Sequence, residues 1–231
     1  MPNIVKKTTF PSLFSLLAPH SCRGCGRIGN PLCDCCKNYI ISHHQNLCPI
    51  CHAPNLNGKC SKCHHLPPIF IVGHRSDLIG ELVHDFKFHS VRDLAYPLAE
   101  ILNTVIPPTK EPTVIIPLPT ITKHIRERGF NHTYLVAKQF SKLRQNCQVS
   151  NLLTRAHSTI QVGSSREKRL SQASTAYALT RNFKINQNTT YILFDDVWTT
   201  GASIQAAFEL IKKAGAKDII VGLLALSSFN H

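Results

Sequence analysis

The sequence predicts an α/β protein in which a mostly parallel sheet is flanked by helices and preceded by a small cysteine-rich domain. Two observations lead to this fold class. From residue 69 onward, short apolar runs alternate with stretches whose apolar residues recur at helical spacing. Before residue 66, eight of the ten cysteines are arranged in four C-x-x-C pairs. We place the boundary at Leu66-Pro67-Pro68, which gives domains at 1–66 and 67–231, a division that suits a chain of 231 residues.

The cysteine pairs indicate metal binding and not disulfide bonding. Two cysteines three residues apart can direct both sulfurs at one tetrahedral metal ion, whereas a disulfide between them would close a strained ring. Thiols that bind metal indicate a reducing compartment, and we therefore expect the cytoplasm. Cys35 offers an alternative partner for Cys33, and the sequence leaves open which pairs share an ion. Four pairs suffice for two structural Zn²⁺ ions, with the expected ligands Cys22, Cys25, Cys33, Cys36, Cys48, Cys51, Cys60 and Cys63.

The segment before Cys22 resembles a targeting signal only weakly. Lys6 and Lys7 precede an apolar stretch at 10–18, but this stretch is short and is interrupted by Pro11. We expect instead an amphipathic helix that packs on the rest of the protein. No stretch of the sequence approaches the length of a membrane-spanning helix.

The large domain is expected to contain strands separated by helices. One helix should be capped by Ser76, and another, at 94–105, should carry Pro97 in its first turn or else be kinked by it. Further helices are expected at 131–143 and before Gly215. Because strands and helices alternate, the sheet should be mostly parallel, and a ligand should bind at the carboxyl ends of its strands. The apolar runs that we expect to form the strands lie at 69–73, 113–116, about 149–153, 191–194 and 218–226.

The most informative segment is a strand-to-helix junction at 191–203, which reads Y-I-L-F-D-D-V-W-T-T-G-A-S. Two acids are expected where the strand ends, and a turn of hydroxyl residues and glycine leads into the next helix. The amino terminus of a helix favours an anion, while paired carboxylates accept hydrogen bonds from vicinal hydroxyls or hold a divalent ion. A ribose 5-phosphate has both kinds of group. The candidate ligand-binding residues are Asp195, Asp196, Val197, Thr199, Thr200, Gly201, Ala202 and Ser203.

A basic segment at 123–131 is a second candidate part of the site. It reads K-H-I-R-E-R-G-F-N and is expected to be a loop in which Gly129 permits movement of Arg126 and Arg128 over a phosphate. A solvated basic turn without a ligand would have the same composition. Neither a Walker A loop nor a G-x-G-x-x-G fingerprint occurs in the sequence.

These motifs together resemble a known family. D-D-V-x-T-T-G-A-[ST] is similar to the motif by which type I phosphoribosyltransferases bind phosphoribosyl pyrophosphate (PRPP). With R-x-R-G-F-N at 126–131, a P-x-P segment at 117–119 and the cysteine pairs, the chain resembles the ComF family of competence-associated proteins. His132 stands where that family usually has glutamine. A segment at 157–177 resembles the family's polar hood, with matches at Gln161, Gly163, Ser165, Arg169 and Tyr177.

The resemblance implies a type I phosphoribosyltransferase-like fold behind a double zinc ribbon. It implies that Asp195 and Asp196 hold the ribose hydroxyls and that the following turn holds the 5-phosphate. Pro119 and Thr120 would belong to a loop around the pyrophosphate. Mg²⁺ would accompany PRPP as the ligand or substrate, and the candidate catalytic residues near the leaving group are Arg126, Arg128 and Lys87.

Two functions remain open at this point. A net charge of +13 suits an anionic partner such as single-stranded DNA, and the resemblance implies a role in DNA uptake during natural transformation, alongside an uptake helicase or recombination proteins. In that interpretation the chain is a binding module that senses PRPP. Alternatively, the chain is a true phosphoribosyltransferase of nucleotide metabolism, for which the sequence shows no acceptor pocket. Whether the protein is an enzyme is therefore left open.

Overall fold

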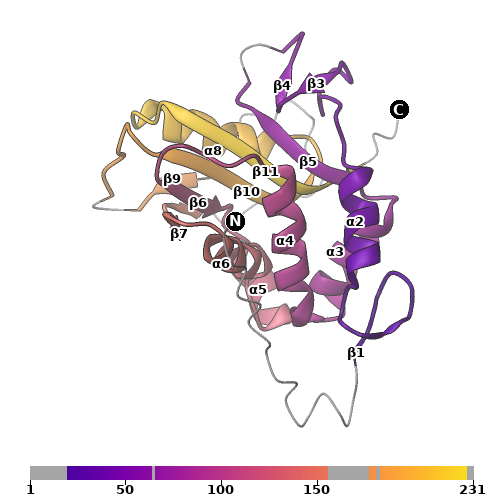
Figure 1. Cartoon of the computed structure of the whole chain (residues 1–231). Coiled ribbons are helices and arrows are strands. Elements are labelled where there is room, and N and C mark those ends of the chain that lie inside the picture. The colour runs from indigo at the N-terminus through magenta and orange to yellow at the C-terminus, as the bar shows by residue number, and fades with distance from the viewer. Residues whose placement is uncertain (1–19, 64–65, 156–176, 181–182, 228–231) are drawn as a thin grey trace, which may run out of the picture.

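The computed structural model of the chain describes residues 20–63, 66–155, 177–180 and 183–227. Its centre is a five-stranded sheet in the order β5-β11-β10-β6-β7, and all four pairings in it are parallel (Figure 1). The strands are β5 (Ile69–His74), β6 (Thr113–Pro117), β7 (Cys147–Val149), β10 (Thr190–Trp198) and β11 (Asp218–Leu226). The predicted parallel sheet is thus confirmed.

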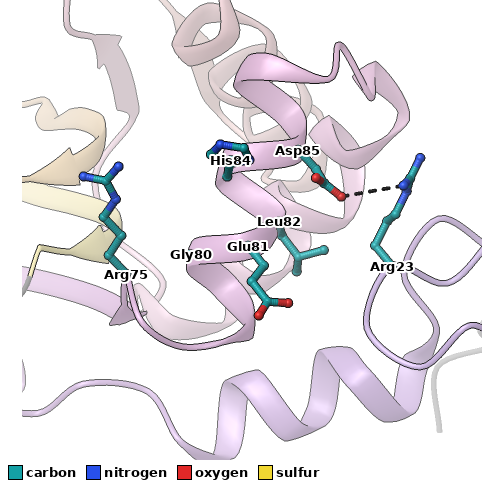
Figure 2. Close-up of a pocket in the computed structure, with 7 residues that line it drawn as sticks. All are labelled: Arg23, Arg75, Gly80, Glu81, Leu82, His84 and Asp85. Atoms are coloured by element: carbon teal, nitrogen blue, oxygen red, sulfur yellow. Dashed lines mark ion pairs between the residues drawn. The ribbon is translucent and has the colours of Figure 1, made fainter.

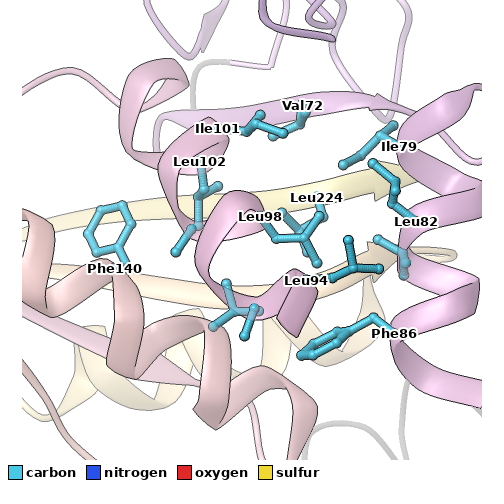
Figure 3. Packing of buried hydrophobic residues seen from close by; sticks show 14 of the residues in the cluster. Val72, Ile79, Leu82, Phe86, Leu94, Leu98, Ile101, Leu102, Phe140 and Leu224 are labelled. Carbon is cyan, nitrogen blue, oxygen red and sulfur yellow. The ribbon is translucent and has the colours of Figure 1, made fainter. Parts of the chain in front are cut away.

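Helices cover both faces of this sheet. Side chains alternate along β10, so that Ile192 and Phe194 enter one hydrophobic core while Tyr191 and Leu193 enter the other. The first core is closed by α3 (Leu78–Phe88), α4 (Ala95–Val105) and α6 (His132–Leu143), whose packing is shown in Figure 3. The second is closed by α8 (Ala202–Lys213) and a hairpin of β8 (Leu153–Arg155) and β9 (Tyr177–Leu179).

The cysteine-rich region consists of short elements around one helix. These are β1 (His20–Ser21), β2 (Ile28–Gly29), α2 (Asp34–Ser42), β3 (Asn55–Leu56) and β4 (Lys59–Cys60). Cys22, Leu32, Cys36 and Ile40 lie in the same hydrophobic core as α3 and α4. Lys37 of α2 also pairs with Glu100 of α4 at 2.8 Å. The two regions therefore share a core, and the boundary at residue 66 stays a prediction.

Several elements differ in detail from the expectation. The helix expected to be capped by Ser76 has Asp77 as its N-cap, and the Asp77 carboxylate accepts the His74 N–H at 3.0 Å. The strand expected at about 149–153 is divided between β7 in the sheet and β8 in the hairpin.

Pro97 lies in the first turn of α4, as predicted. The helix expected before Cys22 lies outside the described residues. Among the described residues, no helix combines the length and apolar character needed to cross a membrane.

Candidate functional site

The paired acids lie on the open edge of a strand that continues past them. Pairing between β6 and β10 ends at Phe194 and Pro117, whereas pairing between β10 and β11 continues to Trp198 and Leu226. The sequence predicts that the strand ends before the acids, and this is wrong because β11 extends it. Asp195 and Asp196 thus lie on a part of β10 that is paired with β11 alone.

Asp196 joins three elements of the fold. It is only 6% exposed, and one of its carboxylate oxygens lies 2.5 Å from Lys87 Nζ, at the end of α3. The same oxygen is in contact with His132 Nε2, at the start of α6. Burial opposes ionisation, but the hydrogen bond from His132 and the charge of Lys87 outweigh it and hold the pKa of Asp196 well below its usual range.

Asp195 behaves in the opposite way. Burial, together with the adjacent charge of Asp196, raises the pKa of Asp195 to about 8. The Asp195 carboxyl group accepts the backbone N–H of Asp196 at 2.9 Å. The pKa values of the two carboxyl groups are therefore shifted in opposite directions, and a cation bound beside Asp195 would favour its charged form.

His132 is a site residue that the sequence analysis did not assign. Its Nδ1 lies 3.1 Å from Nη1 of Arg128. Because a guanidinium group can only donate, Nδ1 must accept, and Nε2 then carries the proton that it donates to Asp196. His132 thus connects three predicted residues in one chain of contacts, Arg128–His132–Asp196–Lys87. The available signal was its position directly after the R-x-R-G-F-N motif.

Replacement of His132 tests this arrangement. In His132→Leu, Asp196 loses a donor and Arg128 loses an acceptor, so we expect the free energy of unfolding to fall by about 1–3 kcal/mol. His132→Gln can keep both contacts and should lose less. Urea unfolding followed by circular dichroism measures both variants, and equal stability of the two would contradict the proposed hydrogen bonds.

The basic segment is a helix and not the expected loop. Residues 122–128 form α5 (Thr122–Arg128), which ends at Gly129 with φ of 75°. Arg92 donates to the Gly129 carbonyl at 3.2 Å and lies 4.9 Å from the centre of the Phe130 ring. Arg128 is likewise held, because its guanidinium lies 5.3 Å from the centre of the Phe88 ring. Arg126, in contrast, is exposed. The predicted movement of this segment stays a prediction.

The hydroxyl and glycine turn has the form expected of an anion site. Thr199 and Thr200 are exposed, and Gly201 is the N-cap of α8 with φ of 75°. The first N–H groups of any α-helix lack partners within the helix, and those of α8 follow directly after Gly201. A Cβ atom at Gly201 would lie 2.1 Å from the indole ring of Trp198. Only glycine therefore fits both the backbone conformation and the space.

Gly201→Ala is expected to destabilise the protein by more than about 1 kcal/mol, because it adds both strain at positive φ and a clash with Trp198. Trp198 is the only tryptophan of the chain, so its fluorescence should change as well. Gly215→Ala is the matched control, since Gly215 also has positive φ but no heavy atom near the Cβ position. Thermal unfolding measures the difference between the two, and equal losses would show that the clash is relieved at no cost.

The P-x-P segment lies beside the acids. The backbone N–H of Leu118 donates to the carbonyl of Phe194 at 2.8 Å, which holds Pro119 and Thr120 next to β10. Arg155 Nε donates to the carbonyl of Pro119 at 3.1 Å. Like His132, Arg155 is a residue near the site that the sequence did not indicate. Of the predicted hood residues only Tyr177 is described. Gln161, Gly163, Ser165 and Arg169 lie outside the described residues.

The cysteines form two separate tetrads. One consists of Cys22, Cys25, Cys33 and Cys36, the other of Cys48, Cys51, Cys60 and Cys63, and within each the four sulfurs lie within 4.8 Å of one another. Tetrahedral Zn²⁺ with Zn–S bonds of about 2.3 Å requires sulfurs about 3.8 Å apart. Cys25 and Cys33 Sγ are 3.7 Å apart, and Cys51 and Cys60 Sγ are 3.4 Å apart. Both tetrads could therefore hold zinc, and the first tetrad includes Cys36 and not Cys35. The choice of Cys36 as a zinc ligand stays a prediction.

Thiolate formation is favoured at one cysteine of each tetrad. Burial opposes ionisation of Cys22, but N–H groups that include that of Cys33 outweigh it and lower the pKa of Cys22 to about 6. In the second tetrad, desolvation is similarly outweighed by the N–H groups of Lys62 and Cys63, and the pKa of Cys60 falls to about 7. Burial raises the pKa of Cys36, and the hydrogen bond with Cys51 raises the pKa of Cys63. Zinc binds the thiolate form, so metal binding to these tetrads would release protons.

Comparison with known proteins finds two competence proteins that are similar to this chain. No protein-family model matches it. Competence protein F of Haemophilus influenzae is 28% identical over 223 residues, which cover 88% of this chain and 94% of that protein. Competence protein ComFC of Streptococcus pneumoniae is 25% identical over 219 residues, which cover 91% and 90%. Among solved structures, a hypoxanthine phosphoribosyltransferase from Staphylococcus aureus is similar over 60% of this chain and 64% of the chain of that enzyme. The TM-score is 0.36 and the sequence identity is 10%, so this similarity carries no argument. The two competence proteins match nearly the whole chain, and their similarity supports the resemblance to the ComF family.

Proposed function

We propose that this protein binds PRPP with Mg²⁺ and acts in DNA uptake during natural transformation, where it contacts single-stranded DNA. The observation that carries the proposal is the placement of two acids on the strand that leads into the amino terminus of α8. Asp195 and Asp196 would hold the ribose hydroxyls and the metal ion, and residues 199–203 would hold the 5-phosphate. The names of the two relatives support the role in competence.

The donor set fits such a ligand. Carboxylate oxygens suit Mg²⁺, exposed threonine hydroxyls and helix N–H groups suit a phosphate, and Lys87 and Arg128 lie within reach of further negative charge. When bound, Mg²⁺ would neutralise charge on the pyrophosphate. The protein's own residues would orient the ribose and would hold the leaving group near Lys87, Arg126 and Arg128.

Isothermal titration calorimetry with PRPP in the presence of Mg²⁺ tests the ligand. We expect one site per chain, with weaker binding of ribose 5-phosphate, which lacks the pyrophosphate, and no heat with inorganic phosphate at the same concentration. Absence of binding by the zinc-loaded protein would refute this part of the proposal. DNA contact is tested separately, by the salt dependence of the affinity for a single-stranded oligonucleotide, which should fall steeply as salt rises.

True transferase activity is the second candidate. It is favoured by a cavity of about 190 Å³ beside Asp196 and Thr199, where an acceptor could approach the sugar. Release of pyrophosphate from PRPP upon addition of nucleobases, amines or DNA would establish turnover. PRPP binding without release under all of these conditions would leave the binding module as the function.

A further inference from the structure

Two adjoining cavities follow α3 at the carboxyl end of the sheet. The smaller one contains Asp196, Thr199 and the exposed ring of Phe88. The larger one, about 430 Å³, extends to Arg23 of the cysteine-rich region and is shown in Figure 2. Arg75, Gly80 and His84 line both cavities, so the two meet over the first half of α3. The larger volume lies within the range of about 300–1,000 Å³ typical of ligand sites.

One cation in this cleft is not neutralised. Arg23 pairs with Asp85 at 3.7 Å, and Lys87 pairs with Asp196. Arg75 is exposed and makes no ion pair with any residue in the described ranges. Figure 2 shows the Asp85 carboxylate directed at Arg23, whereas Arg75 and His84 lie on the other side of the helix. Glu81 also lines the larger cavity and makes no ion pair within the described ranges, but it does not line the smaller cavity beside Asp196. The part of the cleft nearest the candidate site thus presents the positive charge of Arg75.

The position of Arg75 is fixed by the backbone. Its N–H donates to the carbonyl of Leu226 at 2.8 Å, which ties the turn to the end of β11. A Cβ atom at Gly80 would lie 2.0 Å from the Arg75 carbonyl oxygen, so α3 approaches this turn as closely as glycine allows. The turn and the helix therefore hold the start of the Arg75 side chain beside His84.

Two aromatic rings complete the cleft. Phe88 is 59% exposed although Arg128 lies 5.3 Å from its ring centre, and that centre lies 5.0 Å from the ring centre of His84. A flat ring can stack on such a surface, and an anionic group on the same molecule can reach Arg75. A nucleotide has both features. Its base must be unpaired to offer a face for stacking, which excludes a base within a duplex.

We propose that the cleft formed by Arg75, His84 and Phe88 holds one nucleotide of single-stranded DNA. The base stacks on Phe88 and His84, and a phosphate pairs with Arg75. This inference rests on the DNA contact within the proposed function and gives it a location. It places the strand next to Asp196, so that the DNA and the candidate PRPP site share the wall formed by Lys87 and Phe88.

Fluorescence anisotropy with a labelled oligothymidylate of about 12 nucleotides tests the location at fixed salt. We expect Arg75→Ala and Phe88→Ala each to weaken binding about tenfold, as expected for one lost stacking or phosphate contact. Arg27→Ala and Tyr39→Ala are matched controls outside the cleft. Tyr39 is 58% exposed and stacks near His43 at 4.4 Å, which closely matches the Phe88 pair. Both controls should bind within about twofold of the unmodified protein.

An abasic oligonucleotide with the same number of phosphates separates the two contacts. It should bind the unmodified protein about tenfold more weakly than oligothymidylate, and Phe88→Ala should bind the two strands equally. Equal binding of both strands by the unmodified protein, or equal losses in the cleft and control variants, would overturn the inference while leaving DNA contact in place. Absence of all DNA binding would remove that part of the proposed function, and the calorimetric titration with PRPP is independent of both results.

Discussion

Replacement of Asp195 and Asp196 together by asparagine is expected to abolish measurable binding of PRPP in the presence of Mg²⁺. Asparagine keeps the shape of each side chain, and Oδ1 at position 195 can still accept the Asp196 N–H. The charge is lost, however, and with it the ligand for a metal ion. Each hydrogen bond to a charged group contributes about 1.5–3 kcal/mol, so loss of two reduces affinity by about a hundredfold or more. Calorimetry at several ligand concentrations measures the loss.

A second aspartate of the same sheet provides the control. Asp218 starts β11, at the opposite end of the strand from the site, and accepts a hydrogen bond from the Thr190 hydroxyl at 2.5 Å. Asp218→Asn should leave PRPP affinity unchanged. Circular dichroism and thermal unfolding of all variants verify the fold. Unchanged affinity in the double variant would refute the assignment of the acids.

The single variants separate the roles of the two acids. Asp196→Asn leaves the half-buried Lys87 without its counter-ion, so it should reduce stability as well as affinity. Asp195→Asn removes a group whose pKa is already raised, and it should reduce affinity with little loss of stability. A larger stability loss in Asp195→Asn than in Asp196→Asn would contradict the contacts described here.

The sheet was predictable because its strands are apolar on both faces. Tyr191-Ile192-Leu193-Phe194 contains no polar residue, and such a run fits a strand with helices above and below it. The cysteine spacing was equally informative, since a metal ion constrains its ligands locally. The extension of β10 through Asp195 to Trp198 could not be predicted, because it depends on pairing with β11 and not on the residues of β10 themselves.

The other features that the sequence did not predict depend on contacts between elements far apart in the chain. Lys87, His132 and Asp196 meet although they lie on two helices and a strand far apart in the sequence. A buried histidine beside an aspartate leaves no periodic signal. The basic segment was expected to be a loop because R-x-R-G-F-N has little apolar periodicity, yet Gly129 ends a short helix there. The cleft along α3 is likewise formed by two regions that the sequence treats as separate domains.

Loss of zinc from the tetrad that contains Cys22 is expected to destabilise the protein more than loss of zinc from the tetrad that contains Cys48. In Cys48→Ser and in Cys22→Ser, metal analysis should find about one zinc per chain in place of two. Cys35→Ser is the control, because Cys35 is exposed and belongs to neither tetrad. It should keep both ions, and zinc loss in this variant would contradict the ligand assignment.

The stability of the variants should differ because only the first tetrad is continuous with the main core. Cys22 and Cys36 pack in the same cluster as Leu98 and Phe86, whereas none of the cysteines of the second tetrad belongs to that cluster. Cys22→Ser should therefore lower the melting temperature of the whole chain, and Cys48→Ser should mainly expose residues 48–63 to proteolysis. Thermal unfolding and limited proteolysis measure these two effects. Equal melting temperatures would show that the cysteine-rich region folds independently of the sheet, which would in turn support a domain boundary at residue 66.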